Sequence, residues 1–88
     1  MTKQKVLVID DEENVCELVS MYFDKAGYEV ITAVDGADGI EKARQYRPDI
    51  IILDLMLPGM DGLDVCKEIR KSSNIPIIML TARVDEVD

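Results

Sequence analysis

The hydrophobic residues of this sequence gather in short runs that polar residues do not interrupt. Three such runs, at residues 6–9, 50–53 and 77–80, are apolar throughout and rich in Val, Ile and Leu. Unbroken runs of this kind are typical of strands that are covered on both faces, as in a parallel sheet. A weaker run at 28–33 alternates in part and predicts an edge strand.

The segments between the runs show helical spacing. The first predicted helix begins with Glu12 and Glu13, whose charges favour a helix N-terminus, and stops at Gly27. Its apolar positions follow the i, i+3, i+4, i+7 pattern: Val15, Leu18, Val19, Tyr22, Phe23 and Ala26. A second helix is predicted around Ile40 and a third around Cys66, with Asp61 as the N-cap of the third.

The predicted order is therefore β-α-β-α-β-α-β, without repeats or linkers. Such alternation is typical of an α/β fold with a right-handed, doubly wound parallel sheet. A chain of 88 residues suits one domain. The last residues, Ala-Arg-Val-Asp-Glu-Val-Asp at 82–88, are expected to form a loop that enters a fourth helix, so the fold is expected to be incomplete.

Charge and composition narrow the class of protein. With 18 acidic and 10 basic residues the net charge is −8, which argues against direct nucleic-acid binding by this segment. The apolar runs are too short to span a bilayer, and the N-terminus is not that of a signal peptide. Cys16 and Cys66 are expected to be buried, reduced thiols, and a cytoplasmic location follows as the expectation. The absence of His excludes an imidazole base.

The candidate functional side chains lie where the predicted strands end. Asp10 and Asp11 follow the first run, Asp54 follows the third, and Thr81 follows the fourth. Ligands of doubly wound sheets bind beyond the carboxyl ends of the strands. If the first and third strands are neighbours, three carboxylates converge there and must take up protons or hold a cation. A site of oxygen ligands with room for water suits Mg²⁺.

The turn after the first strand separates this site from sites that bind phosphate directly. Such sites offer Gly, Ser, Thr or Lys, whose N–H groups or charge meet an anion. Here the turn reads Ile-Asp-Asp-Glu-Glu at 9–13, which would repel phosphate until a cation is bound. A carboxylate beside Mg²⁺ and a hydroxyl donor is a plausible nucleophile for phosphoryl transfer, and the product would be an aspartyl phosphate.

Three motifs together resemble the receiver domain of bacterial two-component response regulators. They are VLVIDDEE at 6–13, PDIIILDLMLPGMDG at 48–62 and IPIIMLTA at 75–82. The resemblance implies a flavodoxin-like sheet of order 2-1-3-4, with a fifth strand and the last helices missing. It also implies two partners: a sensor histidine kinase that donates phosphate, and an output domain or protein that responds to it. The 88 residues would then form a partial receiver, which is a signalling switch and not an enzyme.

The resemblance also assigns roles to individual residues. Asp54 would be the phosphoacceptor, and Asp10, Asp11 and the backbone carbonyl of Met56 would join it in binding Mg²⁺. In this assignment Asp11 is a direct ligand and Asp10 acts mainly through water. Thr81 would hydrogen-bond the phosphoryl group. The phosphate-binding lysine of the family's fifth strand has no counterpart here, so slow phosphorylation of this segment is expected.

Two further expectations concern function and assembly. A haloacid-dehalogenase-like phosphohydrolase also uses a strand-end Asp and Mg²⁺, but it needs a second Asp at the position of Met56. A receiver fragment used only for interaction or assembly is the other alternative.

Without a fifth strand, residues 77–80 would form an apolar edge without a charge to protect it, and self-association is the expected result.

Overall fold

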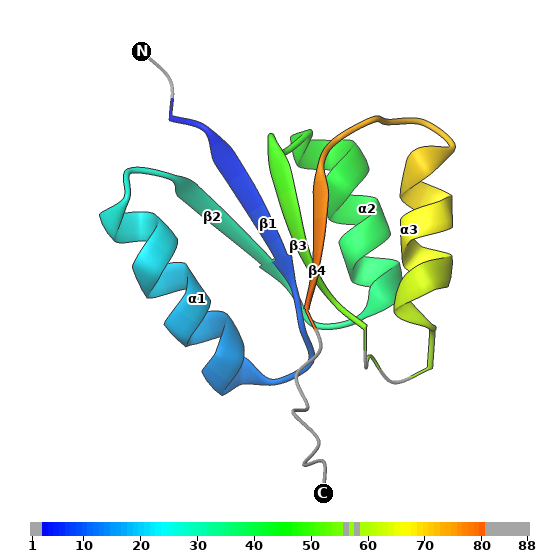
Figure 1. Ribbon diagram of the computed structural model, residues 1–88, viewed down its shortest axis with the longest axis horizontal. Helices are drawn as coiled ribbons and strands as arrows, with labels where there is room; N and C mark the ends of the chain where they lie inside the picture. The colour runs from blue at the N-terminus through cyan, green and yellow to red at the C-terminus, as the bar shows by residue number, and fades with distance from the viewer. Residues whose placement is uncertain (1–2, 56, 58, 81–88) are drawn as a thin grey trace, which may run out of the picture.

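The computed structural model describes residues 3–55, 57 and 59–80 as four parallel strands and three helices (Figure 1). The sheet has the order β2-β1-β3-β4, so the predicted α/β fold and strand order are confirmed. In chain order the elements are β1 (Lys5–Ile9), α1 (Glu13–Lys25), β2 (Glu29–Ala33), α2 (Gly36–Tyr46), β3 (Ile50–Asp54), α3 (Gly62–Arg70) and β4 (Ile77–Leu80).

The helices lie in two layers, with α1 on one face of the sheet and α2 and α3 on the other (Figure 1). The larger part of the core lies under α2 and α3. There the odd-numbered apolar residues of β1 and β3 are fully buried and form one cluster with Val65 and Ile69 of α3. These strand residues are Leu7, Ile9, Ile51 and Leu53. Both faces of the central strands are buried, which explains their unbroken apolar runs.

The core under α1 is smaller and corrects one expectation. Cys16, Val19 and Phe23 of α1 pack with the even-numbered apolar residues of β1 and β3. Leu18 and Tyr22, which the helical pattern placed on the same apolar face, are 56% and 69% exposed. The apolar positions predicted from the helical spacing cover a wider part of the helix surface than the sheet contacts. Leu18 belongs to this wider part, because it lies on a different side of the helix from Cys16 and Phe23.

The helix ends largely follow local sequence signals. The side chain of Asp61 accepts a hydrogen bond from the Leu63 N–H at 3.1 Å, which confirms the predicted N-cap of α3. Asp35 caps α2 in the same way through the N–H of Asp38, at 2.8 Å. Glu12 precedes α1 without a side-chain capping bond. Gly27 has a φ of 93° after α1, a conformation that glycine adopts without strain.

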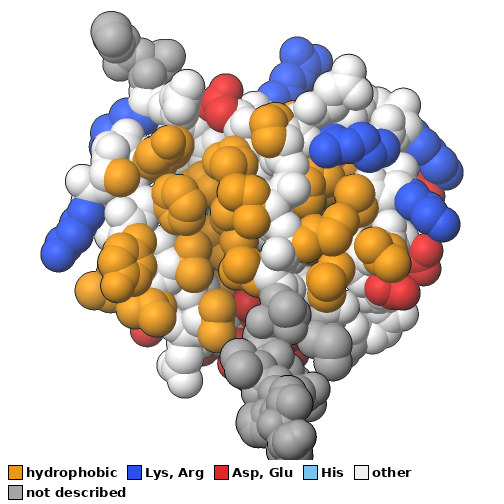
Figure 2. Space-filling model, viewed as in Figure 1, with side chains coloured by type: hydrophobic (Ala, Val, Ile, Leu, Met, Phe, Trp, Pro, Cys, Tyr) orange, Lys and Arg blue, Asp and Glu red, His pale blue; other side chains and the backbone are white. Residues whose placement is uncertain are grey.

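Strand β4 is the outer strand of the described sheet on the side of β3. Ile78, Met79 and Leu80 are 46%, 38% and 37% exposed, and none of the four residues of β4 is charged. Figure 2 shows hydrophobic side chains gathered on both sides of this strand, between α1 and α3. The predicted apolar edge is therefore present within the described residues.

Candidate functional site

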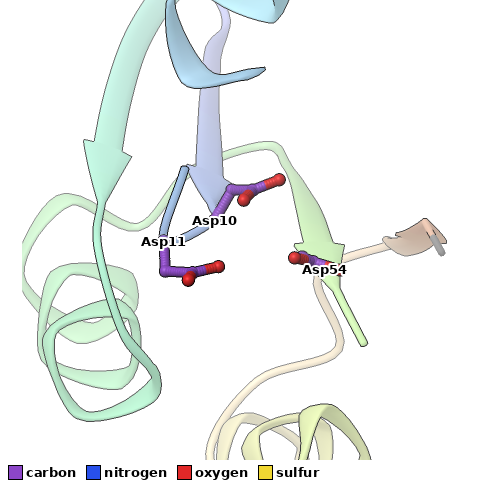
Figure 3. Close-up of side chains that lie close together, drawn as sticks. All are labelled: Asp10, Asp11 and Asp54. Carbon is purple, nitrogen blue, oxygen red and sulfur yellow. The ribbon is translucent and has the colours of Figure 1, made fainter. Parts of the chain in front are cut away.

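The acidic site forms where β1 and β3 end side by side. The two strands pair in parallel with Ile9 opposite Leu53, so the next residues, Asp10 and Asp54, are neighbours. Asp11 follows on the same turn, and the three side chains share one small volume (Figure 3). One carboxylate oxygen of each residue lies within 4.8 Å of the others. Asp10 and Asp54 are buried, whereas Asp11 is exposed and leaves the site accessible from solvent.

Asp10 is held in place by both its backbone and its side chain. Its N–H donates to the Ala33 carbonyl at 3.0 Å, which ties the end of β1 to β2. Its carboxylate Oδ1 accepts from the Glu12 N–H at 3.0 Å, and its carbonyl accepts from Cys16 Sγ at 3.3 Å. These contacts fix the start of the turn, so the Asp10 carboxylate is oriented before any ligand binds.

The electrostatics of the site favour either a proton or a cation. Burial raises the pKa of Asp10, and the charges of Asp54, Asp11 and Glu12 raise it further, against the lowering effect of the Glu12 N–H. At an effective dielectric of ~20, two carboxylates at this separation repel each other by roughly 3 kcal/mol. A divalent cation would replace this repulsion with attraction, and three carboxylates match the oxygen ligands that Mg²⁺ prefers.

Asp54 ends β3, and the structure around it is tightly packed. Asp54 pairs with Leu80 in the register of β3 and β4, and the N–H of Leu55 donates to the Leu80 carbonyl at 3.0 Å. Gly62, at the start of α3, lies against the same segment. A Cβ atom at Gly62 would meet the Leu55 Cα at 2.8 Å, so only glycine lets α3 begin this close to the phosphoacceptor candidate.

The structure brings together Asp10, Asp11 and Asp54, as the sequence predicted. Met56 and Thr81 lie outside the described residues, so their predicted roles stay predictions. Glu12 contributes its backbone N–H to the site, and neither Glu12 nor Glu13 belongs to the carboxylate cluster.

The cysteines divide between two environments. Cys66 is half-buried, which corrects the expectation that it is fully buried, whereas Cys16 is buried as expected. Burial raises the pKa of Cys16, and so does the charge of Asp10. The hydrogen bond from Cys16 to the Asp10 carbonyl was not predicted from the sequence. The sequence signal that could have indicated this bond is the position of Cys16 near the start of the helix that follows Asp10 and Asp11.

Comparison with known proteins decides the family. The family model described as "Response regulator receiver domain" matches residues 6–88. The chain belongs to this family. Receivers are signalling domains of two-component systems, so the predicted fold, family and signalling class are confirmed. Membership also favours a receiver over the haloacid-dehalogenase-like alternative.

Solved receiver structures are similar along almost the whole chain. The chemotaxis response regulator CheY4 of Vibrio cholerae is 40% identical with a TM-score of 0.88, and the match covers 96% of this chain and 72% of that one. The BeF3-activated N-terminal receiver domain of Klebsiella pneumoniae RstA is 30% identical with a TM-score of 0.86, covering 94% and 71%. The N-terminal domain of a response regulator receiver protein from Methanoculleus marisnigri JR1 is 30% identical with a TM-score of 0.87, covering 93% and 69%.

Within the described ranges, no helix has both the length and the apolar character needed to cross a membrane.

Proposed function

We propose that this receiver accepts a phosphoryl group on Asp54 from a sensor histidine kinase, at an Mg²⁺ site formed by Asp10, Asp11 and Asp54. The observation that carries the proposal is the convergence of the three carboxylates, within 4.8 Å, from the ends of two adjacent strands. The partners that follow are the kinase and an output domain or protein. A cytoplasmic location and the absence of direct nucleic-acid binding belong to the same proposal.

The reaction is a transfer between two nucleophiles. An Asp54 carboxylate oxygen attacks the phosphorus of a phosphohistidine, the P–N bond breaks as the P–O bond forms, and the imidazole leaves with the bonding electrons and takes up a proton. When bound, Mg²⁺ supplies positive charge to the phosphoryl oxygens and to the acidic site. Asp10 is fixed by the Glu12 N–H, and Asp11 is exposed to solvent, so both carboxylates would be in place to hold the cation.

Two further roles complete the proposed site. The backbone carbonyl of Met56 is the remaining protein ligand to the metal, and the Thr81 hydroxyl donates to a phosphoryl oxygen. Both roles are inferred from the family motifs. Met56 stands two residues after Asp54, and Thr81 directly follows the fourth apolar run. Replacing Thr81 with Ala should slow phosphorylation and leave Mg²⁺ affinity unchanged.

Phosphorylation is tested with a small phosphodonor such as acetyl phosphate. Intact mass spectrometry should show one added phosphoryl group in the presence of Mg²⁺ and none with EDTA. Asp54→Asn should abolish the addition, whereas Asp64→Asn, at an exposed acid of α3, should not change it. Equal labelling of Asp54→Asn and the parent would overturn the assignment, and sustained hydrolysis of p-nitrophenyl phosphate would support the phosphohydrolase alternative instead.

The metal ligands are tested by calorimetry or by NMR shifts, because the chain has no Trp. Binding of Mg²⁺ should be weak, since much of its coordination shell stays water. Asp11→Ala should weaken it more than Glu12→Ala, because Asp11 belongs to the cluster and Glu12 contributes only a backbone N–H. Equal losses in the two variants would remove the ligand role of Asp11.

We further propose that the 88-residue chain self-associates through β4. The described edge of β4 is apolar and uncharged, and a second copy could continue the sheet there through backbone hydrogen bonds. A two-fold contact would place β4 against β4 and bury Ile78 and Leu80, which lie on the less covered face of the sheet.

Sedimentation at several protein concentrations tests the self-association. The parent chain should gain mass with concentration, and Met79→Lys should shift the equilibrium towards monomer. Ser72→Lys adds the same charge at an exposed position outside the sheet and serves as the control. A monomer at every concentration would contradict the proposal without affecting the assignment of Asp54.

A further inference from the structure

A groove lies between the C-terminal parts of α2 and α3, at the opposite ends of the strands from the acidic site. Its volume is about 670 Å³. Apolar side chains and two Arg and two Ser residues line it: Ile40, Ala43, Arg44, Arg47, Pro48, Ile69, Ser72, Ser73 and Ile75. None of the nine is acidic. A mostly apolar lining with a few charged groups is typical of a recognition site.

The charge of the groove is opposite to that of the chain as a whole. The net charge is −8, yet Arg44 and Arg47 form no ion pair with any residue that the structure describes. The neighbouring acid, Glu68, is paired with Lys71 at 2.9 Å, and its pKa is lowered by Lys71 and to a smaller degree by Arg44. Figure 2 shows Lys and Arg side chains over the upper part of α2 and α3. Two guanidinium groups are thus available to an anionic partner.

The walls of the groove are held by local contacts. Arg47 ends α2 with a φ of 48°, and its N–H donates to the Ala43 carbonyl at 3.1 Å. On the other wall, Arg70 donates to the Ser73 carbonyl at 3.3 Å, and the Ile75 N–H donates to Ser73 Oγ at 3.1 Å. These hydrogen bonds hold both walls in place, and a preorganised groove lowers the entropic cost of binding.

A second hollow of about 590 Å³ adjoins the groove along α2. Ile40 and Arg44 line both, and Ala37, Glu41 and Gln45 complete the second. The combined surface is elongated and follows the helix. An extended shape of this kind fits a segment of polypeptide, whose side chains can enter successive hollows, better than one compact small molecule.

We propose that the groove between α2 and α3 binds an acidic peptide segment of a partner protein. Apolar side chains of the segment pack on Ile40, Ile69 and Ile75, and its carboxylates meet Arg44 and Arg47. Arginine suits this role because its planar guanidinium can hold a carboxylate through two hydrogen bonds. The surface lies away from Asp54, so the proposal does not depend on phosphorylation.

The test uses a fluorescein-labelled peptide made of Leu and Glu, with Leu at i, i+3, i+4 and i+7, and measures its anisotropy on titration with the whole chain. Arg44→Glu and Arg47→Glu should each weaken binding about fivefold or more. Lys25→Glu is the matched control, because it also reverses a basic residue in the last turn of a helix but lies on α1. It should leave the affinity within a factor of two of the parent.

Two additional measurements separate the contributions of charge and apolar contact. A peptide with Lys in place of Glu should not bind the parent chain. A peptide with Ser in place of Leu should bind the parent chain no more tightly than the original peptide binds the Arg44→Glu variant. Ser72→Trp, at an exposed lining position, should obstruct the groove and weaken binding. The proposal is overturned if Lys25→Glu weakens binding as much as Arg44→Glu, or if the parent chain does not bind the acidic peptide at low salt.

Discussion

Replacing Asp10 with Asn should stabilise the metal-free fold, although Asp10 belongs to the proposed metal site. The residue is only 3% exposed, and its carboxylate has oxygens of Asp11 and Asp54 within 4.8 Å. Each neighbouring charge costs roughly 3 kcal/mol at an effective dielectric of ~20. Proton uptake by Asp10 and solvent around Asp11 relieve part of this cost, and the Asn carbonyl can still accept from the Glu12 N–H. We expect a net gain of about 1 to 2 kcal/mol in the free energy of unfolding.

Urea unfolding at neutral pH with EDTA, at low protein concentration, measures this gain. Glu17→Gln is the control, because it removes one negative charge from an exposed position of α1 outside the carboxylate cluster and should change stability little. Adding Mg²⁺ should stabilise the parent chain and leave Asp10→Asn almost unchanged, since binding to the native state raises stability only where the site is intact.

The pH dependence supplies a second check on the same reasoning. The pKa of Asp10 is raised in the folded chain, so the folded state binds more protons than the unfolded state between the ordinary pKa of Asp and the raised one. The contribution of Asp10 to stability is thus lost as the pH rises through this window. The difference in the free energy of unfolding between Asp10→Asn and the parent should therefore grow over the same interval. A variant that is less stable than the parent at neutral pH in EDTA, or whose advantage is the same in acid, would refute the electrostatic account.

Three further substitutions test the packing around the site and the helices, each by urea unfolding. Gly62→Ala should destabilise the fold by about 1 to 3 kcal/mol, because its Cβ would lie 2.8 Å from the Leu55 Cα; a loss no larger than that of Ser72→Ala would contradict the tight approach. Leu7→Ala, at a fully buried position, should cost about 2 to 5 kcal/mol, whereas Leu18→Ala should cost much less because Leu18 is exposed. Asp35→Ala should cost about 1 kcal/mol by removing the cap of α2, and Asp35→Asn should restore most of it.

Local pattern was enough to predict most of the architecture and the identity of the acids in the site. The runs at 6–9 and 50–53 became β1 and β3, because a strand covered on both faces needs apolar residues at every position. Asp61 was predicted as a helix cap, and it is one, because capping depends on neighbouring residues alone. Asp10, Asp11 and Asp54 were predicted from their places after strands, since parallel strands deliver their carboxyl ends to one edge of the sheet.

Contacts between elements decided what the local pattern left open. Leu18 has the same helical signal as Val19 but is exposed, because the sheet under α1 covers only one side of that helix. The hydrogen bond from Cys16 to Asp10 and the groove that holds Arg44 and Arg47 also depend on how helices meet the sheet and each other. A sequence period gives the direction of a side chain around its own helix or strand. Which neighbour lies in that direction, and how closely, is set by the packing of the whole chain.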